Sequence, residues 1–324
     1  MTIRSLLSIL ADGKFHSGRE LGEELGISRS AIWKHMRRLE EGGLEIYSVK
    51  GRGYRVPGGL ELLDGELIRQ ALSEEVSNKI DAMSLELTIP STNEQAMKAC
   101  QQENCHGRLY LAEQQTAGRG RRGRPWVSPF ARNLYFSLVW RFEQGAAALE
   151  GLSLLVGLAT VKALEKNGIS GVQLKWPNDL LYQNKKLAGV LIELNGEASG
   201  QCQVVIGVGI NVEMPQDLSD KIDQPWTDLK TIAGTRVSRN QLMGHILNEL
   251  VSSLESFEAE GFSELAEEWQ SYHALQGQQV ALQLGNGTVV GVCQGIDASG
   301  ALLLDTESGR EVFHGGEISV QRTL

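Results

Sequence analysis

The chain has 324 residues, of which 41% are hydrophobic and 22% charged, and its net charge is −9. This balance is typical of a globular protein of two or three domains, and it excludes wholesale disorder. No apolar run approaches the roughly 18 residues of a transmembrane helix, and no signal peptide is apparent, so we expect a cytoplasmic protein without a membrane partner. The four cysteines show no C-x-x-C spacing, which favours reduced thiols over a metal site.

Residues 1–58 are predicted to form a winged helix-turn-helix domain. A short helix over residues 3–10 precedes two helices within residues 17–43, which begin at Ser17 and Ser28. Two strands follow within residues 44–56, around a basic turn that forms the wing. The alternative is a small helical domain with a solvated basic face. The turn, the caps and the wing together favour DNA binding.

The second of these helices has one apolar stripe, Ile32, Met36 and Leu39, and an opposite face rich in hydrogen-bond donors. Residues 1–58 have ten Lys and Arg against seven Asp and Glu, so the net charge of this segment is +3 and that of the remaining chain is −12. The basic head and the acidic body are therefore expected to bind different partners. The residues predicted to contact DNA are Ser28, Arg29, Ser30, Trp33, Lys34, Arg37, Lys50 and Arg52.

A mixed α+β domain is predicted over residues 64–272, after a hinge at residues 57–59. The most apolar stretch, residues 149–164, is expected to be a buried core helix. Residues 276–324 alternate short strands with tight turns, the pattern of a small SH3-like β-barrel. The predicted fold class is thus α/β multidomain, with three domains in chain order.

The segment GRGRRGRPW, residues 118–126, concentrates four arginines in an acidic domain. Its first six residues fit the G-x-G-x-x-G dinucleotide motif, but that motif must open a helix, and Pro125 and Pro129 disfavour one. Strands are predicted on both sides, at residues 109–115 and 133–142. Two interpretations remain, namely a nucleic-acid patch or a mobile loop that closes on a small polyanion.

Four further stretches of this domain could hold chemistry, although each has a structural explanation. STNEQAMKA (91–99) begins a helix and LKWPND (174–179) ends a strand in a turn. KKLAGVLIEL (185–194) places Lys186 at the head of an apolar strand. In VVIGVGINV (204–212), two glycines leave room for a group against the backbone, or mark a bulge.

In this order along one chain, these motifs resemble the biotin protein ligases. The predicted domains of residues 1–58 and 276–324 narrow the resemblance to the bifunctional kind that also represses the biotin operon. The strongest marks are QTAGRGRRGRPW, KWPND, KLAGVLIEL, GVGINV and the closing GGEIS. The resemblance implies an enzyme that joins biotin to ATP with Mg²⁺, holds biotinyl-5′-AMP, and passes biotin to a lysine of the biotin carboxyl carrier protein of acetyl-CoA carboxylase. It also implies a homodimer, loaded with biotinyl-5′-AMP as corepressor, on operator DNA.

The resemblance also implies a set of site residues. Biotin contacts are expected from Ser91, Thr92, Asn93, Gln115, Arg119, Gly120, Arg121, Lys186, Trp126 and Gly207. Nucleotide contacts are expected from Arg121, Arg122, Lys175, Asn178, Asn211 and Trp226. Catalytic roles fall to Lys186, Arg121 and Asp179, the last as proton acceptor or Mg²⁺ contact. Pro90 stands where the family usually has Asp, so an ion or water held by that carboxylate is not carried over.

This reaction explains why one loop carries four arginines. A carboxylate must approach the α-phosphate of ATP, and the repulsion between these anions has to be screened by cations. Two competing hypotheses are a ligand-sensing repressor that has lost catalysis, and direct nucleic-acid binding by the arginine loop. The retained Lys186 and Asp179 disfavour the first, and the acidic surrounding domain disfavours the second.

Overall fold

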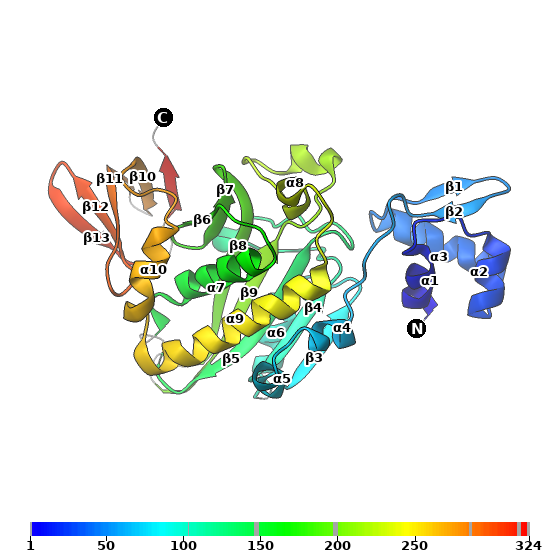
Figure 1. The fold of residues 1–324 in the computed structure, drawn as a ribbon, viewed down its shortest axis with the longest axis horizontal. Coiled ribbons are helices and arrows are strands. Elements are labelled where there is room, and N and C mark those ends of the chain that lie inside the picture. Colours follow the sequence, from blue (N-terminus) through cyan, green and yellow to red (C-terminus); the bar gives the residue numbers. More distant parts are fainter. Residues whose placement is uncertain are drawn as a thin grey trace.

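The computed structural model describes residues 2–102, 104–145, 149–196, 200–284, 287–315 and 319–322. A helical head and a β-rich tail lie at opposite ends of a body built on one large sheet (Figure 1). Across these residues, none of the helices is both long and apolar enough to cross a membrane. The three-part fold class expected from the sequence is confirmed.

The head is a winged helix-turn-helix. Its elements are α1 (Thr2–Leu10), α2 (Gly18–Leu25), α3 (Arg29–Glu41) and the antiparallel strands β1 (Tyr47–Val49) and β2 (Gly53–Arg55). The capping box before α2 is present, because the Glu20 N–H donates to Ser17 Oγ at 3.1 Å and the Ser17 N–H donates to the Glu20 carboxylate at 2.9 Å. Gly26 ends α2 in the left-handed region, with φ 67°, so α3 can turn away.

The body contains a seven-stranded sheet in the order β3–β4–β5–β9–β8–β7–β6, in which β3 and β4 are parallel and the other neighbours antiparallel. The strands are β3 (Ala82–Glu86), β4 (Arg108–Ala112), β5 (Leu134–Phe142), β6 (Val172–Lys175), β7 (Asp179–Tyr182), β8 (Lys185–Gly196) and β9 (Cys202–Ile210). In this register Ser137 pairs with Gly207, and Gly207 pairs with Leu191. Three distant segments of the sequence therefore lie side by side.

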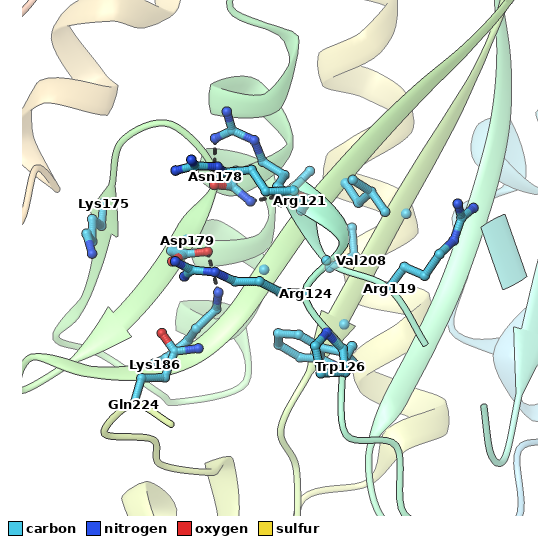
Figure 2. A pocket seen from close by; sticks show the side chains of 18 of the residues that line it. Arg119, Arg121, Arg124, Trp126, Lys175, Asn178, Asp179, Lys186, Val208 and Gln224 are labelled. Carbon is cyan, nitrogen blue, oxygen red and sulfur yellow. Dashed lines mark hydrogen bonds and ion pairs between the residues drawn. The ribbon is translucent and has the colours of Figure 1, made fainter. Parts of the chain in front are cut away.

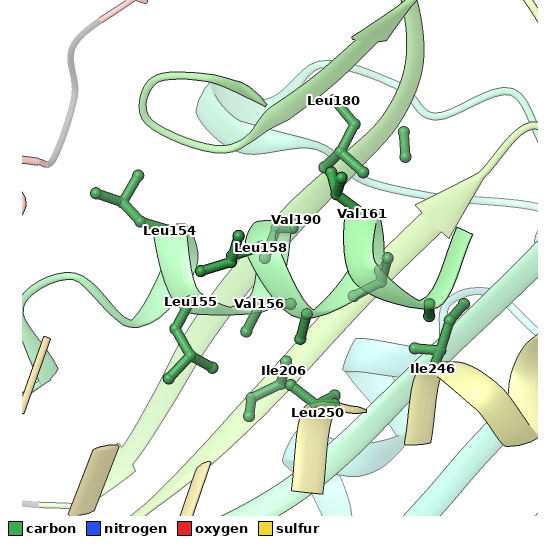
Figure 3. Packing of buried hydrophobic residues seen from close by; sticks show 14 of the residues in the cluster. Leu154, Leu155, Val156, Leu158, Val161, Leu180, Val190, Ile206, Ile246 and Leu250 are labelled. Carbon is green, nitrogen blue, oxygen red and sulfur yellow. The ribbon is translucent and has the colours of Figure 1, made fainter. Parts of the chain in front are cut away.

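Helices cover both faces of this sheet. The helices of the body are α4 (Gly65–Gln70), α5 (Glu74–Lys79), α6 (Thr92–Cys100), α7 (Leu152–Lys166), α8 (Leu229–Ala233), α9 (Arg239–Glu260) and α10 (Ala266–Ser271), and of these α6 and α7 pack on opposite faces. The expected core helix is confirmed as α7, whose leucines and valines pack against β8, β9 and α9 (Figure 3). Because side chains alternate along a strand, the opposite face packs separately against α6, through a small cluster that includes Tyr110, Val139 and Val205.

The tail is an antiparallel sheet in the order β13–β12–β11–β10–β14, with β10 (Gln279–Leu284), β11 (Gly287–Ile296), β12 (Leu302–Thr306), β13 (Gly309–Phe313) and β14 (Ser319–Arg322). Val280 and Leu302 belong to the same hydrophobic cluster as the body, and Trp176 Nε1–H donates to the Gly300 carbonyl at 3.0 Å. The tail is therefore fixed to the body by a shared core. Of the GGEIS motif, residues 316–318 lie outside the described residues.

Candidate active site

A cavity of about 430 Å³ lies on the side of the sheet that faces α6 and the arginine loop (Figure 2). This volume is within the range of small-molecule sites. Its lining includes residues 91–93, 115, 119–122, 124–126, 175–179, 186, 189–191, 207–209, 223–225 and 320. The structure thus brings together in one cavity the four motif stretches and the arginine loop.

Positive charge dominates this cavity. Among the described residues that line it, six are cationic and two are carboxylates (Asp179 and Asp223); the cationic ones are Arg119, Arg121, Arg122, Arg124, Lys175 and Lys186. Lys186 Nζ lies 2.7 Å from Asp179 Oδ1, and both side chains are only 17% exposed. Burial lowers the pKa of the Lys175 ammonium, an effect that Asp179 opposes. Arg121, Lys175 and Lys186 are partly buried whereas Arg119, Arg122 and Arg124 are exposed, and the excess of positive charge suits an anion with several charges.

The arginine loop is a tight hairpin between β4 and β5. The Gly120 N–H donates to the Arg124 carbonyl and the Trp126 N–H donates to the Gly118 carbonyl, both at 2.8 Å. Only a three-residue 3₁₀ turn, Arg121–Gly123, interrupts it. The expected arrangement of strand, loop and strand is confirmed, and the dinucleotide interpretation fails because no α-helix follows the glycines.

The two glycines of β9 make room for two side chains. A Cβ on Gly207 would lie 2.0 Å from Asn93 Oδ1, and a Cβ on Gly209 would lie 2.6 Å from the Trp126 ring. The register of β9 with both neighbours is regular through this stretch, so close approach rather than a bulge explains the glycines. Lys186 Nζ lies 5.5 Å from the centroid of the same Trp126 ring.

Buried polar groups line the part of the cavity where α6 begins. Gln115 Oε1 accepts from the Thr92 N–H at 2.9 Å and lies 3.2 Å from Thr92 Oγ1. Ser137 Oγ lies 2.8 Å from Thr92 Oγ1 and 2.6 Å from Asn93 Oδ1. Ser91 serves as the cap of α6, accepting from the Glu94 N–H at 3.4 Å. The expected cluster of Ser91, Thr92, Asn93 and Gln115 therefore exists around one end of the cavity.

Ser137 is a residue that the sequence analysis missed. It is fully buried and touches two of the predicted ligand contacts. The available signal was a single small polar residue in the middle of strand β5, whose one charged residue, Arg141, lies near the end of the strand. Val320 from β14 also lines the cavity, so the tail contributes to its wall, and no local feature of the sequence indicated this.

Two predicted nucleotide contacts lie outside the cavity lining as far as the described residues extend. Asn211 is buried and its Nδ2 donates to the Thr227 carbonyl at 3.1 Å. Trp226 belongs to a segment that pairs with the backbone of Lys186. The Lys186 N–H donates to the Pro225 carbonyl, and the Thr227 N–H donates to the Lys186 carbonyl. Their contacts with a nucleotide stay predictions.

Asp179 is the predicted Mg²⁺ contact. Over the described residues, no group of three or more His, Cys, Asp or Glu side chains could hold a metal. Mg²⁺ is commonly held by one or two carboxylates together with substrate phosphates, and Asp179 fits that arrangement. Pro90, in place of the family's Asp, offers its carbonyl oxygen to the Ala117 N–H at 2.9 Å.

The predicted DNA-contacting side chains are all exposed on the head. Trp33 is 53% exposed, and the Arg37 guanidinium lies 5.6 Å from its ring centroid. In the wing, the Arg52 guanidinium lies 4.2 Å from the Phe15 ring. Ile32, Met36 and Leu39 are buried, as the apolar stripe of α3 predicted.

Comparison with known proteins identifies the same three parts. Residues 2–55 match the HTH domain, residues 85–211 the Biotin/lipoate A/B protein ligase family, and residues 276–321 the Biotin protein ligase C terminal domain. The chain is 42% identical to the Bifunctional ligase/repressor BirA of Salmonella typhimurium, over 98% of this chain and 97% of that protein. With its counterpart from Escherichia coli the identity is 40%, over 98% and 96%.

Among solved structures, the biotin protein ligase from Aquifex aeolicus in complex with biotin and ATP is similar. It has a TM-score of 0.66 and 30% identity, covering 75% of this chain and 100% of that chain. The family resemblance noted from the motifs is confirmed, and the match extends through head, body and tail. The chain belongs to the family of bifunctional biotin ligase/repressors.

Proposed function

We propose that this protein is an ATP-dependent biotin protein ligase that also represses transcription of biotin synthesis. The observation that supports it most is the cavity with six cations, closed at one end by buried polar groups. The cationic end suits the phosphates of ATP, and the polar end, with the Trp126 wall, suits the ring system of biotin. In the first step, biotin and ATP give biotinyl-5′-AMP and pyrophosphate.

In that step a biotin carboxylate oxygen forms a bond to the α-phosphorus while the bond to the pyrophosphate oxygen breaks. Lys186 and Arg121 lie where they could stabilise the charge that gathers on the α-phosphate. Arg122, Lys175 and Asn178 serve the phosphates, and a Mg²⁺ ion would supply further charge neutralisation at the outer phosphates; Asp179 would hold that ion if it does not act as the proton acceptor. A closed arginine loop would exclude the water that hydrolyses such a mixed anhydride.

In the second step the amine of a carrier lysine attacks the acyl carbon, and AMP leaves. The acceptor is the biotin carboxyl carrier protein of acetyl-CoA carboxylase, and Asp179 is our candidate to receive the proton of the attacking amine. No enzyme nucleophile is required. The reaction takes place in the cytoplasm, where the four buried, unbridged cysteines stay reduced.

The head adds repression to this activity. Its exposed basic face fits the phosphates and the major groove of operator DNA. We propose that loading with biotinyl-5′-AMP orders the loops, favours a homodimer, and so presents two heads to a palindromic site.

Biotin-dependent exchange between ATP and labelled pyrophosphate tests the enzymatic proposal. We expect exchange that requires biotin and Mg²⁺, followed by biotin transfer when the carrier is added. A protein that binds biotin and DNA but catalyses no exchange would instead be a ligand-sensing repressor, and would contradict the proposal.

A further inference from the structure

Glu193 on β8 occupies an unusual place beside the cavity. Side chains alternate along a strand, so Gly189, Leu191 and Glu193 share one face of β8. The first two line the cavity, whereas the Glu193 side chain, 25% exposed, lies just beyond it. Asn195 follows on the same face and its Nδ2 donates to the Cys100 carbonyl at 2.8 Å, so Glu193 carries the one carboxylate on this face of β8.

The carboxylate of Glu193 joins α6 to the arginine loop. Its Oε2 accepts from Asn93 Nδ2 at 2.8 Å, and Asn93, on α6, is 4% exposed. Both of its oxygens accept from Arg119 Nη2, at 3.1 and 3.2 Å. Arg119 belongs to the arginine loop, and its side chain extends away from the group around Lys186 and Asp179 (Figure 2). Glu193 thus ties the loop to the polar end of the cavity.

These contacts complete a chain of polar side chains that begins just before the arginine loop and ends within it. In order, its members are Gln115, Thr92, Ser137, Asn93, Glu193 and Arg119. Gln115 precedes the loop and Arg119 lies within it. A ligand that contacts Thr92, Asn93 and Gln115 would therefore also fix the partner of Arg119.

We infer that Glu193 is a positioning residue, which holds the arginine loop over the bound adenylate through its ion pair with Arg119. This inference rests on the proposed function. This role requires the negative charge of Glu193 and not only a hydrogen-bond acceptor. A glutamine amide at this position could still accept a hydrogen bond from Asn93 but would not attract the Arg119 guanidinium. Glu193→Gln is therefore the informative variant.

The first measurement needs no ligand. Trypsin cleaves after Arg119, Arg121 and Arg122 when the loop detaches. The rate of cleavage at the loop therefore measures, in the full chain, how firmly the loop is held. An exposed ion pair is weak, so we expect Glu193→Gln to speed this cleavage about twofold to fivefold. Glu255→Gln is the matched control, because it removes an ion pair of similar exposure, with Lys79, away from the cavity. It should leave the cleavage rate at the loop unchanged.

The second measurement is the dissociation rate of biotinyl-5′-AMP. Glu193→Gln should raise it by a similar factor, about twofold to fivefold, at low ionic strength, and the difference should vanish near 1 M salt, where the pair is screened. If Glu193 acts through Arg119, the change should not add to that of Arg119→Met. A purely structural role of Glu193 would produce neither the salt dependence nor this coupling.

The outcomes separate the two proposals. A wild-type protein that forms no biotinyl-5′-AMP contradicts the proposed function, while the trypsin measurement still decides on the tether. Unchanged cleavage in Glu193→Gln overturns the inference. Faster cleavage together with fully additive effects in the double variant also overturns it, because Glu193 would then act by a route other than Arg119.

Discussion

The cavity of the body and the exposed face of α3 in the head both concentrate positive charge, but the burial of that charge differs. In the cavity, Lys186 is 17% exposed and paired with Asp179 at 2.7 Å. On the head, the side chains of α3 and the wing are open to solvent, and Trp33 is 53% exposed. Enclosed cations suit a small anion that can be desolvated, whereas exposed cations suit a long polyanion that stays hydrated. The partial burial of Arg121, Lys175 and Lys186, more than residue type, thus distinguishes the cavity from the head.

The largest expected effect comes from removing the exposed cations of the head. Deleting residues 1–58 should lower operator affinity by a factor of about a thousand or more, because specific contacts from the head would be lost. DNA binding by the variant is measured with biotinyl-5′-AMP present. Residual specific binding would mean that the arginine loop recognises DNA.

Because the deletion also uncovers Phe130, which packs in the head's core, a second variant is needed. The triple variant Arg29→Ala, Lys34→Ala and Arg37→Ala leaves that contact covered. It should also bind the operator poorly while keeping its pyrophosphate exchange.

The next effect concerns the enclosed cation. Lys186→Ala should slow adenylate formation by about a hundredfold, the usual consequence of losing a preorganised charge at a transition state. Pyrophosphate exchange measures this rate. Lys185→Ala is the matched control, since Lys185 is the exposed neighbour on the same strand. Near-normal exchange in Lys186→Ala would refute the catalytic role.

A third effect tests how tightly the cavity is built. Gly209→Ala places a methyl group 2.6 Å from the Trp126 ring, so that wall must shift. Overpacking of this kind is worth about 1 to 3 kcal/mol, so biotin affinity should fall about tenfold or the thermal midpoint should drop. At Gly65 a Cβ would meet only the Leu85 side chain, at 3.7 Å, so Gly65→Ala is the control. Unchanged affinity and midpoint in Gly209→Ala would contradict this geometry.

The smallest effect is a pH dependence. Burial lowers the pKa of Lys175 from its ordinary 10.5, so in the folded protein this lysine loses its proton at a lower pH than in the unfolded chain. The unfolded chain then binds more protons over that window, so the ligand-free fold gains stability as pH rises, while ATP affinity falls. Lys175→Arg keeps its charge and should flatten the alkaline loss of ATP affinity, measured by calorimetry. An identical pH profile in both proteins would exclude Lys175 as the titrating group.

The sequence predicted what depends on local pattern. The caps Ser17 and Ser28, the buried stripe of α3 and the hairpin around the arginines all follow from neighbouring residues. Ser137 and Glu193 could not be found in this way, because their partners lie on α6 and the arginine loop, which are far from them in the chain. Likewise, the sequence indicated free space beside Gly207, but it did not indicate that the Asn93 side chain of α6 fills this space.

The arginine loop shows the same limit. Its charge and flanking strands were apparent, yet the direction of each guanidinium was not. Arg121 Nη1 donates to Asn178 Oδ1 at 3.1 Å, whereas Arg119 turns to Glu193. Arg119 pairs in the hairpin whereas Arg121 begins the 3₁₀ turn that interrupts it, so two arginines of one motif reach different partners, which only the folded loop reveals.

The central claim is that the enclosed cations hold an activated biotin. Incubation with ATP, Mg²⁺ and either biotin or lipoate, followed by mass measurement of the bound product, tests it most directly. We predict a complex with the mass of biotinyl-5′-AMP in the first incubation and no lipoyl adenylate in the second. Absence of the biotinyl adenylate, with ATP left intact, would contradict the account.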